Sequence, residues 1–79
     1  MARATKSAEE IQALVHNYVH AIPEVCDDKA EVRVPKPYRH EPDAGGCNWN
    51  MEFFGNARGY ERAIADVLTN VRAKVNLAD

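Results

Sequence analysis

The chain has 79 residues, of which 46% are hydrophobic and 28% charged, and its 10 basic and 12 acidic residues give a formal net charge of -2. A chain this short buries only about 60% of the surface that its unfolded form exposes, so we expect one domain over residues 1–79 that gains stability from a partner. The slightly acidic composition lacks the general attraction to phosphate on which nucleic-acid binding largely depends.

The sequence contains no stretch of the ~20 apolar residues that a membrane helix needs, and polar residues interrupt the N-terminal segment before it reaches signal-peptide length. We therefore expect a cytoplasmic protein without membrane contact. Cys26 and Cys47 form no C-x-x-C pair and are too few for the disulfide framework of a small secreted domain, so both are predicted to be reduced.

The first predicted element is an amphipathic helix over residues 8–21, preceded by a flexible tail over residues 1–6. The S-A-E-E run has the spacing of a capping box, in which Ser7 and Glu10 bond each other's backbone amides. Apolar residues then recur at the i, i+3, i+4, i+7 spacing of one helical face, and Pro23 ends the pattern. This apolar face comprises Ile11, Leu14, Val15, Tyr18, Val19 and Ile22.

Two segments with alternating hydrophobicity predict an antiparallel β-hairpin. The first, residues 30–40, contains two prolines that lack a backbone N–H, so it must be an edge strand or contain a bulge. The second, residues 47–53, alternates strictly and places Trp49 on its inward face. The inward set is Cys47, Trp49, Met51 and Phe53. The connecting residues 41–46, E-P-D-A-G-G, are dense in turn formers.

The hairpin register follows if the apolar side chains of both strands share one face. The predicted pairs are His40–Cys47, Tyr38–Trp49 and Val34–Phe53. This register puts Lys36 on the apolar face, a conflict that a bulge between the two prolines would remove.

The last predicted element is a second amphipathic helix over residues 58–75, followed by a frayed C-terminus over residues 76–79. Its apolar residues are Tyr60, Ile64, Val67, Leu68, Val71 and Val75. Arg72 and Lys74 lie in its final turns, where cations complement the helix dipole. The predicted fold is therefore α+β in the order helix, strand, strand, helix, with the hairpin packed on one face by the two amphipathic helices.

The outward face of the hairpin is the predicted interaction surface. It comprises Arg33, Arg39, Asn48, Asn50, Glu52 and Phe54. The second strand carries no proline and a single charge, so its edge is the one expected to pair with another chain if the second predicted helix does not cover it. The sequence thus predicts a small non-enzymatic protein–protein interaction module that self-associates, as a homodimer, through the hairpin edge.

Two alternatives come from other residue patterns. Tyr38, Arg39, Trp49 and Phe54 resemble a thin version of the aromatic and basic pattern that binds single-stranded nucleic acid, although the alternation sends Tyr38 and Trp49 inward. A nucleic-acid-binding accessory protein is therefore the second choice.

A small metal-binding protein is the third choice. His16 and His20 have the spacing at which two imidazoles share a metal ion, but they lie opposite the apolar face and are predicted to be solvated, with no H-E-x-x-H motif. The run C-D-D-K-A-E, residues 26–31, is expected to be a solvated loop. We predict no cofactor and no metal site. We also predict no enzymatic activity, because so small a domain has little room for a ligand pocket of ~300 to 1,000 Å³.

Overall fold

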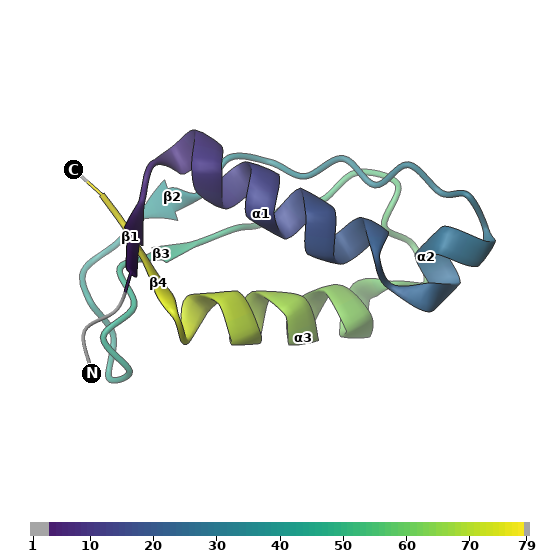
Figure 1. Ribbon diagram of the computed structural model, residues 1–79. Coiled ribbons are helices and arrows are strands. Elements are labelled where there is room, and N and C mark those ends of the chain that lie inside the picture. Colours follow the sequence, from purple (N-terminus) through teal and green to yellow (C-terminus); the bar gives the residue numbers. More distant parts are fainter. Residues whose placement is uncertain (1–3, 79) are drawn as a thin grey trace.

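Three helices and two small sheets make up a compact α+β fold in the computed structural model, which describes residues 4–78 (Figure 1). In chain order the elements are β1 (Ala4–Lys6), α1 (Ala8–His20), α2 (Pro23–Asp27), β2 (Tyr38–Arg39), β3 (Trp49–Asn50), α3 (Glu61–Arg72) and β4 (Val75–Leu77). Strands β2 and β3 form an antiparallel hairpin, whereas β1 and β4 pair in parallel.

Helix α1 confirms the first predicted helix to within one residue. The Glu10 amide donates to Ser7 Oγ at 3.2 Å and the Ser7 amide donates to Glu10 Oε1 at 3.0 Å, so both halves of the capping box are present. These bonds satisfy two backbone amides that a helix N-terminus otherwise leaves unpaired. The hydrogen bond from the Ser7 backbone amide is also the main reason that the pKa of Glu10 is below its usual value.

The loop predicted after α1 is partly wrong, because a second short helix, α2, starts at Pro23. Ile22 has extended geometry (φ -63°, ψ 127°) and Pro23 occupies the first turn, where its fixed φ suits a helix and its missing N–H has no cost. Val25 points into the core and is 1% exposed. The proline therefore ends one helix and begins the next.

The two chain ends also differ from the prediction, because residues 4–6 and 75–77 pair with each other. The register is Ala4 with Val75, Thr5 with Asn76 and Lys6 with Leu77. Helix α3 ends at Arg72, so Val75 belongs to β4 and not to the helix. The alternation of buried Val75 and Leu77 around half-buried Asn76 is the period of a strand. The rest of the predicted tail, residues 1–3, and residue 79 lie outside the described residues.

The predicted hairpin register is wrong by one residue. The structure pairs Arg39 with Trp49 and Tyr38 with Asn50, and the same offset holds at the far end, where Arg33 exchanges two backbone hydrogen bonds with Gly55. The prediction assumed that Tyr38 lies on the apolar face. Its side chain is instead 44% exposed.

The side of the hairpin that faces the core changes partway along both strands. Met51 is 3% exposed, as predicted, but Phe53 is 92% exposed and has a left-handed backbone with φ 64°, while Phe54 is half-buried. The exposures predicted for the two phenylalanines are therefore interchanged. On the first strand, Pro37 is buried and Lys36 is exposed, which resolves the conflict over Lys36.

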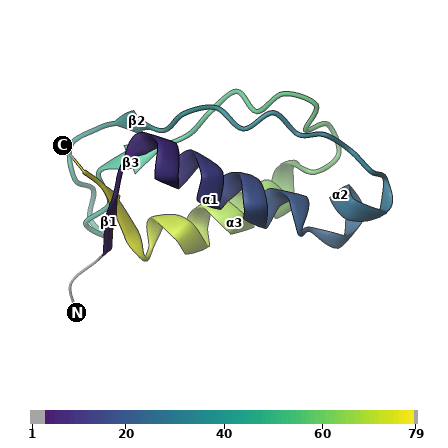
Figure 2. The same cartoon turned by 45° about the horizontal axis from the view of Figure 1, so that its top comes forward.

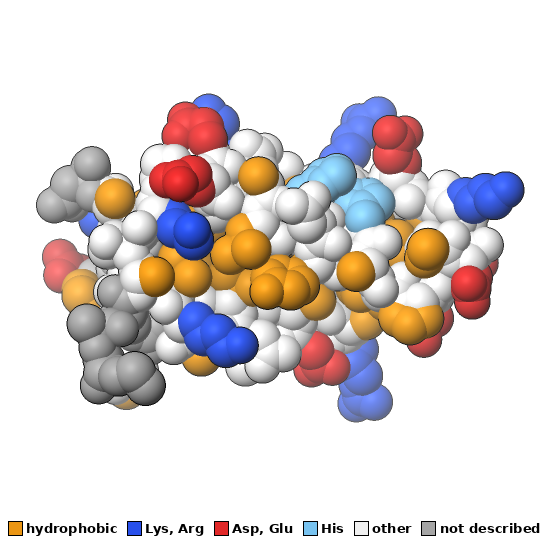
Figure 3. Space-filling view, viewed as in Figure 1, with side chains coloured by type: hydrophobic (Ala, Val, Ile, Leu, Met, Phe, Trp, Pro, Cys, Tyr) orange, Lys and Arg blue, Asp and Glu red, His pale blue; other side chains and the backbone are white. Residues whose placement is uncertain are grey.

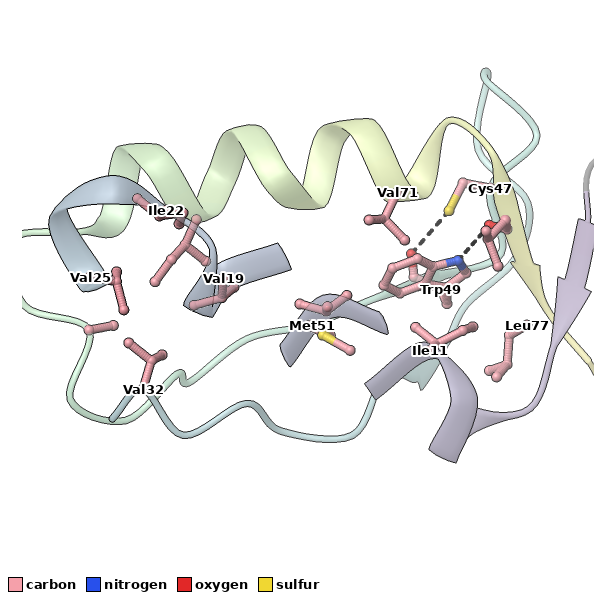
Figure 4. Close-up of a cluster of buried hydrophobic side chains, with 14 residues drawn as sticks. Ile11, Val19, Ile22, Val25, Val32, Cys47, Trp49, Met51, Val71 and Leu77 are labelled. Atoms are coloured by element: carbon pink, nitrogen blue, oxygen red, sulfur yellow. Dashed lines mark hydrogen bonds between the residues drawn. The ribbon is translucent and has the colours of Figure 1, made fainter. Parts of the chain in front are cut away.

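Helices α1 and α3 lie side by side in one layer and the hairpin segments form the other layer (Figures 1 and 2). Trp49 lies in the core between them and is fully buried, which confirms its predicted position (Figure 4). The largest fully buried side chains are those of Ile11, Val15, Val19, Val25 and Trp49.

Candidate interaction surfaces

The six residues of the predicted interaction surface differ in exposure, and they do not form one face that is free to bind a partner. Arg33, Arg39 and Glu52 are exposed, but Asn48, Asn50 and Phe54 are half-buried. The hydrogen bonds of this region therefore decide which side chains remain available to a partner.

Asn48 holds β4 against the hairpin. Its Oδ1 accepts from the Leu77 amide at 2.8 Å and its Nδ2 donates to the Leu77 carbonyl at 3.0 Å. One side-chain amide thus satisfies both backbone groups of a residue 29 positions away, as a neighbouring strand would. The role of Asn48 is structural, and no local sequence pattern indicates it because its partner is distant in the chain.

Arg72 occupies the edge of β3 that was predicted to pair with a second chain. Its Nε donates to the Trp49 carbonyl at 3.0 Å and its Nη2 donates to Asp43 Oδ2 at 2.9 Å. The Trp49 indole N–H in turn donates to the Val75 carbonyl at 2.8 Å. A strand that joined this edge at Trp49 would have to displace the Arg72 side chain.

Asp43 organises the hairpin loop beneath Arg72. Its Oδ1 accepts from the Gly45 amide at 3.0 Å and from the Cys47 amide at 3.1 Å. The Cys47 amide, followed by the Gly45 amide and the Arg72 guanidinium, holds the pKa of Asp43 below its usual value. The carboxylate therefore ties the loop to itself and to α3.

The outer side of the hairpin also uses its polar groups internally. Tyr38 Oη donates to Glu52 Oε1 at 3.0 Å, and this bond to a carboxylate raises the pKa of Tyr38. Arg39 Nη2 donates to the Ala78 carbonyl at 2.6 Å. Three of the six predicted residues, Arg39, Asn48 and Glu52, thus form side-chain hydrogen bonds with distant residues of the same chain.

An apolar groove runs between α1 and α3 on the opposite side of the molecule. It encloses about 380 Å³, and Asn70 and Lys74 are its polar members. The apolar lining consists of Leu14, Tyr18, Val67, Val71 and Val75. Figure 3 shows hydrophobic side chains gathered in a band between the two helices. We call this band the helical groove.

Tyr18 is the most exposed large hydrophobic side chain of the helical groove, at 53%. Ile11, Val15 and Val19 of α1 are buried in the core. Leu14 and Tyr18, on the adjacent part of the same apolar arc, line the groove at the surface. The sequence placed Leu14, Tyr18 and Val67 in the core, because helical spacing shows which residues share an arc but not how much of that arc is covered.

His20 belongs to the fold and is not the solvated side chain that was predicted. Its Nε2 accepts from the Val32 amide at 3.2 Å, and its Nδ1 lies 2.8 Å from the His16 carbonyl. Nearby, Gln12 Nε2 donates to the Val34 carbonyl at 2.9 Å. Two side chains of α1 thus form hydrogen bonds with the backbone of the first hairpin segment, at the Val32 amide and the Val34 carbonyl.

The histidine pair is poorly placed to hold a metal ion. The ring centroids of His16 and His20 are 4.1 Å apart, but both nitrogens of His20 are already engaged. Within residues 4–78, no three His, Cys, Asp or Glu side chains are grouped so that they could hold a metal ion.

A second hollow of about 590 Å³ lies between α3 and the segment that follows β3. Met51, Phe54 and Leu68 supply apolar walls, and Arg58 and Glu61 are its titratable side chains. Glu61 Oε1 accepts from the Gly59 amide at 2.9 Å. The expectation that the domain is too small for a hollow of ligand size is therefore wrong.

The remaining sequence features are local. Cys26 is exposed and Cys47 is buried, and neither forms a disulfide. Trp49 is fully buried and cannot serve as a stacking platform for bases, whereas Tyr38 is half-exposed. In the described part of the chain, every helix is too short or too polar to cross a membrane.

In comparisons with known proteins, no protein-family model, curated protein or solved structure matches the chain.

Proposed function

We propose that this chain is a small non-enzymatic protein–protein interaction module and that the helical groove is its binding surface. The observation that carries the proposal is the exposure of Tyr18 in an apolar groove whose other walls are Leu14, Val67 and Val71. Contiguous apolar surface rimmed by polar residues is typical of an interaction site, whereas single exposed apolar residues are ordinary.

The chemistry of the groove suits a protein partner. Tyrosine is enriched among the residues that dominate binding energy, because it offers a large rigid surface with one polar atom. Leu14 and Val67 supply aliphatic surface on either side, and Lys74 supplies a charge at the rim. A partner helix or loop that covered these side chains would remove apolar surface from water.

The other exposed aromatic residues make weaker candidates. Tyr38 already donates to Glu52, and Phe53 projects from a left-handed turn at the end of the hairpin. The edge of β3 is bonded by Arg72 and Asn48. For these reasons we place the interface on the helical groove and not on the hairpin edge.

We place the protein in the cytoplasm. An exposed thiol such as that of Cys26 persists in a reducing compartment and is readily oxidised outside it.

The test compares two tyrosine variants on opposite sides of the molecule. Tyr18→Lys puts a charge into the helical groove, and Tyr38→Lys makes the same change on the hairpin, where the side chain is exposed to a similar extent. Each immobilised variant captures proteins, including untagged copies of the chain, from a lysate of the native host, and every captured species is quantified against wild type.

We expect a specific partner to bind wild type and Tyr38→Lys but to be lost from Tyr18→Lys. Thermal unfolding of all three proteins confirms that the loss is not due to unfolding. Equal capture by Tyr18→Lys and wild type would overturn the proposal, and loss confined to Tyr38→Lys would return the interface to the hairpin.

A further inference from the structure

We propose that the partner of the helical groove is a second copy of this chain. The two copies face each other antiparallel, related by a two-fold axis that lies in the interface and is perpendicular to the length of the groove. This inference rests on the proposed function, because it identifies the occupant of the same surface. The distribution of charge along the groove carries the inference.

The end of the groove near β1 and β4 is basic. Lys74 is exposed in the lining of the groove, and Lys6 lies in β1, which pairs with β4. The acids at this end have local partners, since Glu10 bonds the Ser7 amide and Glu9 lies 3.5 Å from Lys36.

Helix α2, which follows α1 beyond the opposite end of the groove, is acidic. Glu24, Asp27 and Asp28 are all exposed, and Lys29 is the one cation in the run from Pro23 to Lys29. Figure 3 shows carboxylates at this end, on the same face as the hydrophobic band. Asp28 accepts a hydrogen bond from Tyr60, so Glu24 and Asp27 are the acids of this helix that we assign to the contact.

A two-fold axis between the two charged ends pairs opposite charges at two places. The Lys74 end of each copy then lies over the Glu24 and Asp27 end of the other. An axis parallel to the groove would instead oppose Lys74 to Lys74, and like charges at an interface are unfavourable. Charge therefore selects the antiparallel arrangement.

A dimer contact of standard size would cover most of the helical side. The molecule measures 36 × 20 × 17 Å, so no side has an outline larger than 36 by 20 Å. A standard specific interface buries about 800 Å² on each partner. A domain of 79 residues has a small core of its own and gains stability from covering this apolar groove.

The experiment reverses the charge at one end of the groove at a time. Lys74→Glu makes both ends acidic, and the double variant Glu24→Lys with Asp27→Lys makes both ends basic. Arg33→Glu, a matched charge reversal on the hairpin, is the control. Sedimentation equilibrium at low salt measures self-association of each protein, and of the two groove variants mixed in equal amounts, from micromolar to sub-millimolar concentration.

We expect wild type and Arg33→Glu to dimerise with similar dissociation constants. Each groove variant alone should dimerise about tenfold more weakly, because each isologous contact then contains two like-charged pairs. The equal mixture should recover a heterodimer about as tight as the wild-type homodimer, since each contact regains opposite charges. Added salt should weaken the wild-type dimer.

A wild-type chain that stays monomeric throughout this range, or a mixture that fails to associate more tightly than either variant alone, would overturn the second copy as partner. If Tyr18→Lys nevertheless loses a protein captured by wild type, the proposed function stands with a different occupant. If Tyr18→Lys changes neither capture nor self-association, both proposals fail together.

Discussion

The two broad sides of this molecule use exposed side chains in opposite ways. On the hairpin side, polar residues that the sequence suggests for a partner are bonded within the chain, as Asn48 is to Leu77 and Glu52 to Tyr38. On the helical side, apolar residues that the sequence suggests for the core remain at the surface, with Tyr18 the most exposed. The polarity of a side chain in the sequence therefore does not show whether the folded chain leaves that side chain available.

The largest expected effect is at Trp49, where the hairpin packs into the core. Trp49→Ala should lower the free energy of unfolding by about 3–5 kcal/mol, because it leaves a cavity in a fully buried site. Stability on the order of 0.05–0.15 kcal/mol per residue means that this loss leaves the chain largely unfolded. Urea unfolding followed by circular dichroism measures the change.

Trp49→Phe is the matched control, because it keeps most of the apolar bulk but removes the N–H that bonds the Val75 carbonyl. It should cost less than Trp49→Ala. A folded Trp49→Ala protein with near wild-type stability would show that this side does not hold the core.

A smaller effect is expected at the clamp between the hairpin and β4, by which we mean the two hydrogen bonds between the Asn48 side chain and the Leu77 backbone. Asn48→Ala should cost about 1–3 kcal/mol, because the Leu77 amide and carbonyl lose their partner while partly buried. Glu52→Ala removes only an exposed hydrogen bond and should change stability by less than about 0.5 kcal/mol. Hydrogen exchange at the Leu77 amide should accelerate in Asn48→Ala alone, and equal exchange in both variants would argue against the clamp.

The smallest effect is expected at Asp43 and only in acid. Its pKa is lower in the folded chain than the usual 3.8, first because of the Cys47 amide, so the unfolded chain binds the proton more tightly. The stabilisation is thus complete above pH 3.8 and is lost as pH falls through the lowered pKa. Asp43→Asn should flatten this part of the dependence of unfolding free energy on pH. Identical acid profiles for wild type and variant would show that Asp43 does not secure the loop.

The sequence predicted best what is decided locally. The start of α1 follows from the capping box of Ser7 and Glu10, and the inward positions of Trp49 and Met51 follow from strict alternation. In these cases the deciding residues lie within a few positions of one another. The α+β class follows from the same local patterns.

The features that the sequence missed depend on contacts between distant residues. Strands β1 and β4 have three residues each and pair across most of the chain, so neither has a recognisable pattern alone. The register failed because Tyr38 was assigned by its apolar character, although it bonds Glu52 on the outer side. No propensity predicts that a bulky residue such as Phe53 adopts a left-handed backbone.

The exposure of the helical groove escaped the sequence prediction for a related reason. Helical spacing gave one apolar arc for each helix, and only the packed fold shows that the hairpin covers part of each arc. Leu14, Tyr18 and Val67 lie in the part that it leaves uncovered. The width of the apolar arc on each helix could have suggested that one hairpin would not cover all of it.

The most direct test of the contrast between the two sides is a dilution series followed by backbone amide chemical shifts. As the chain is diluted from sub-millimolar to micromolar concentration, we expect the amide resonances of Leu14, Tyr18, Val67 and Lys74 to shift together while those of Asn50 and Glu52 stay fixed. Concentration-dependent shifts centred on Asn50 and Glu52, with the helical groove unchanged, would contradict the assignment and place the interface on the hairpin.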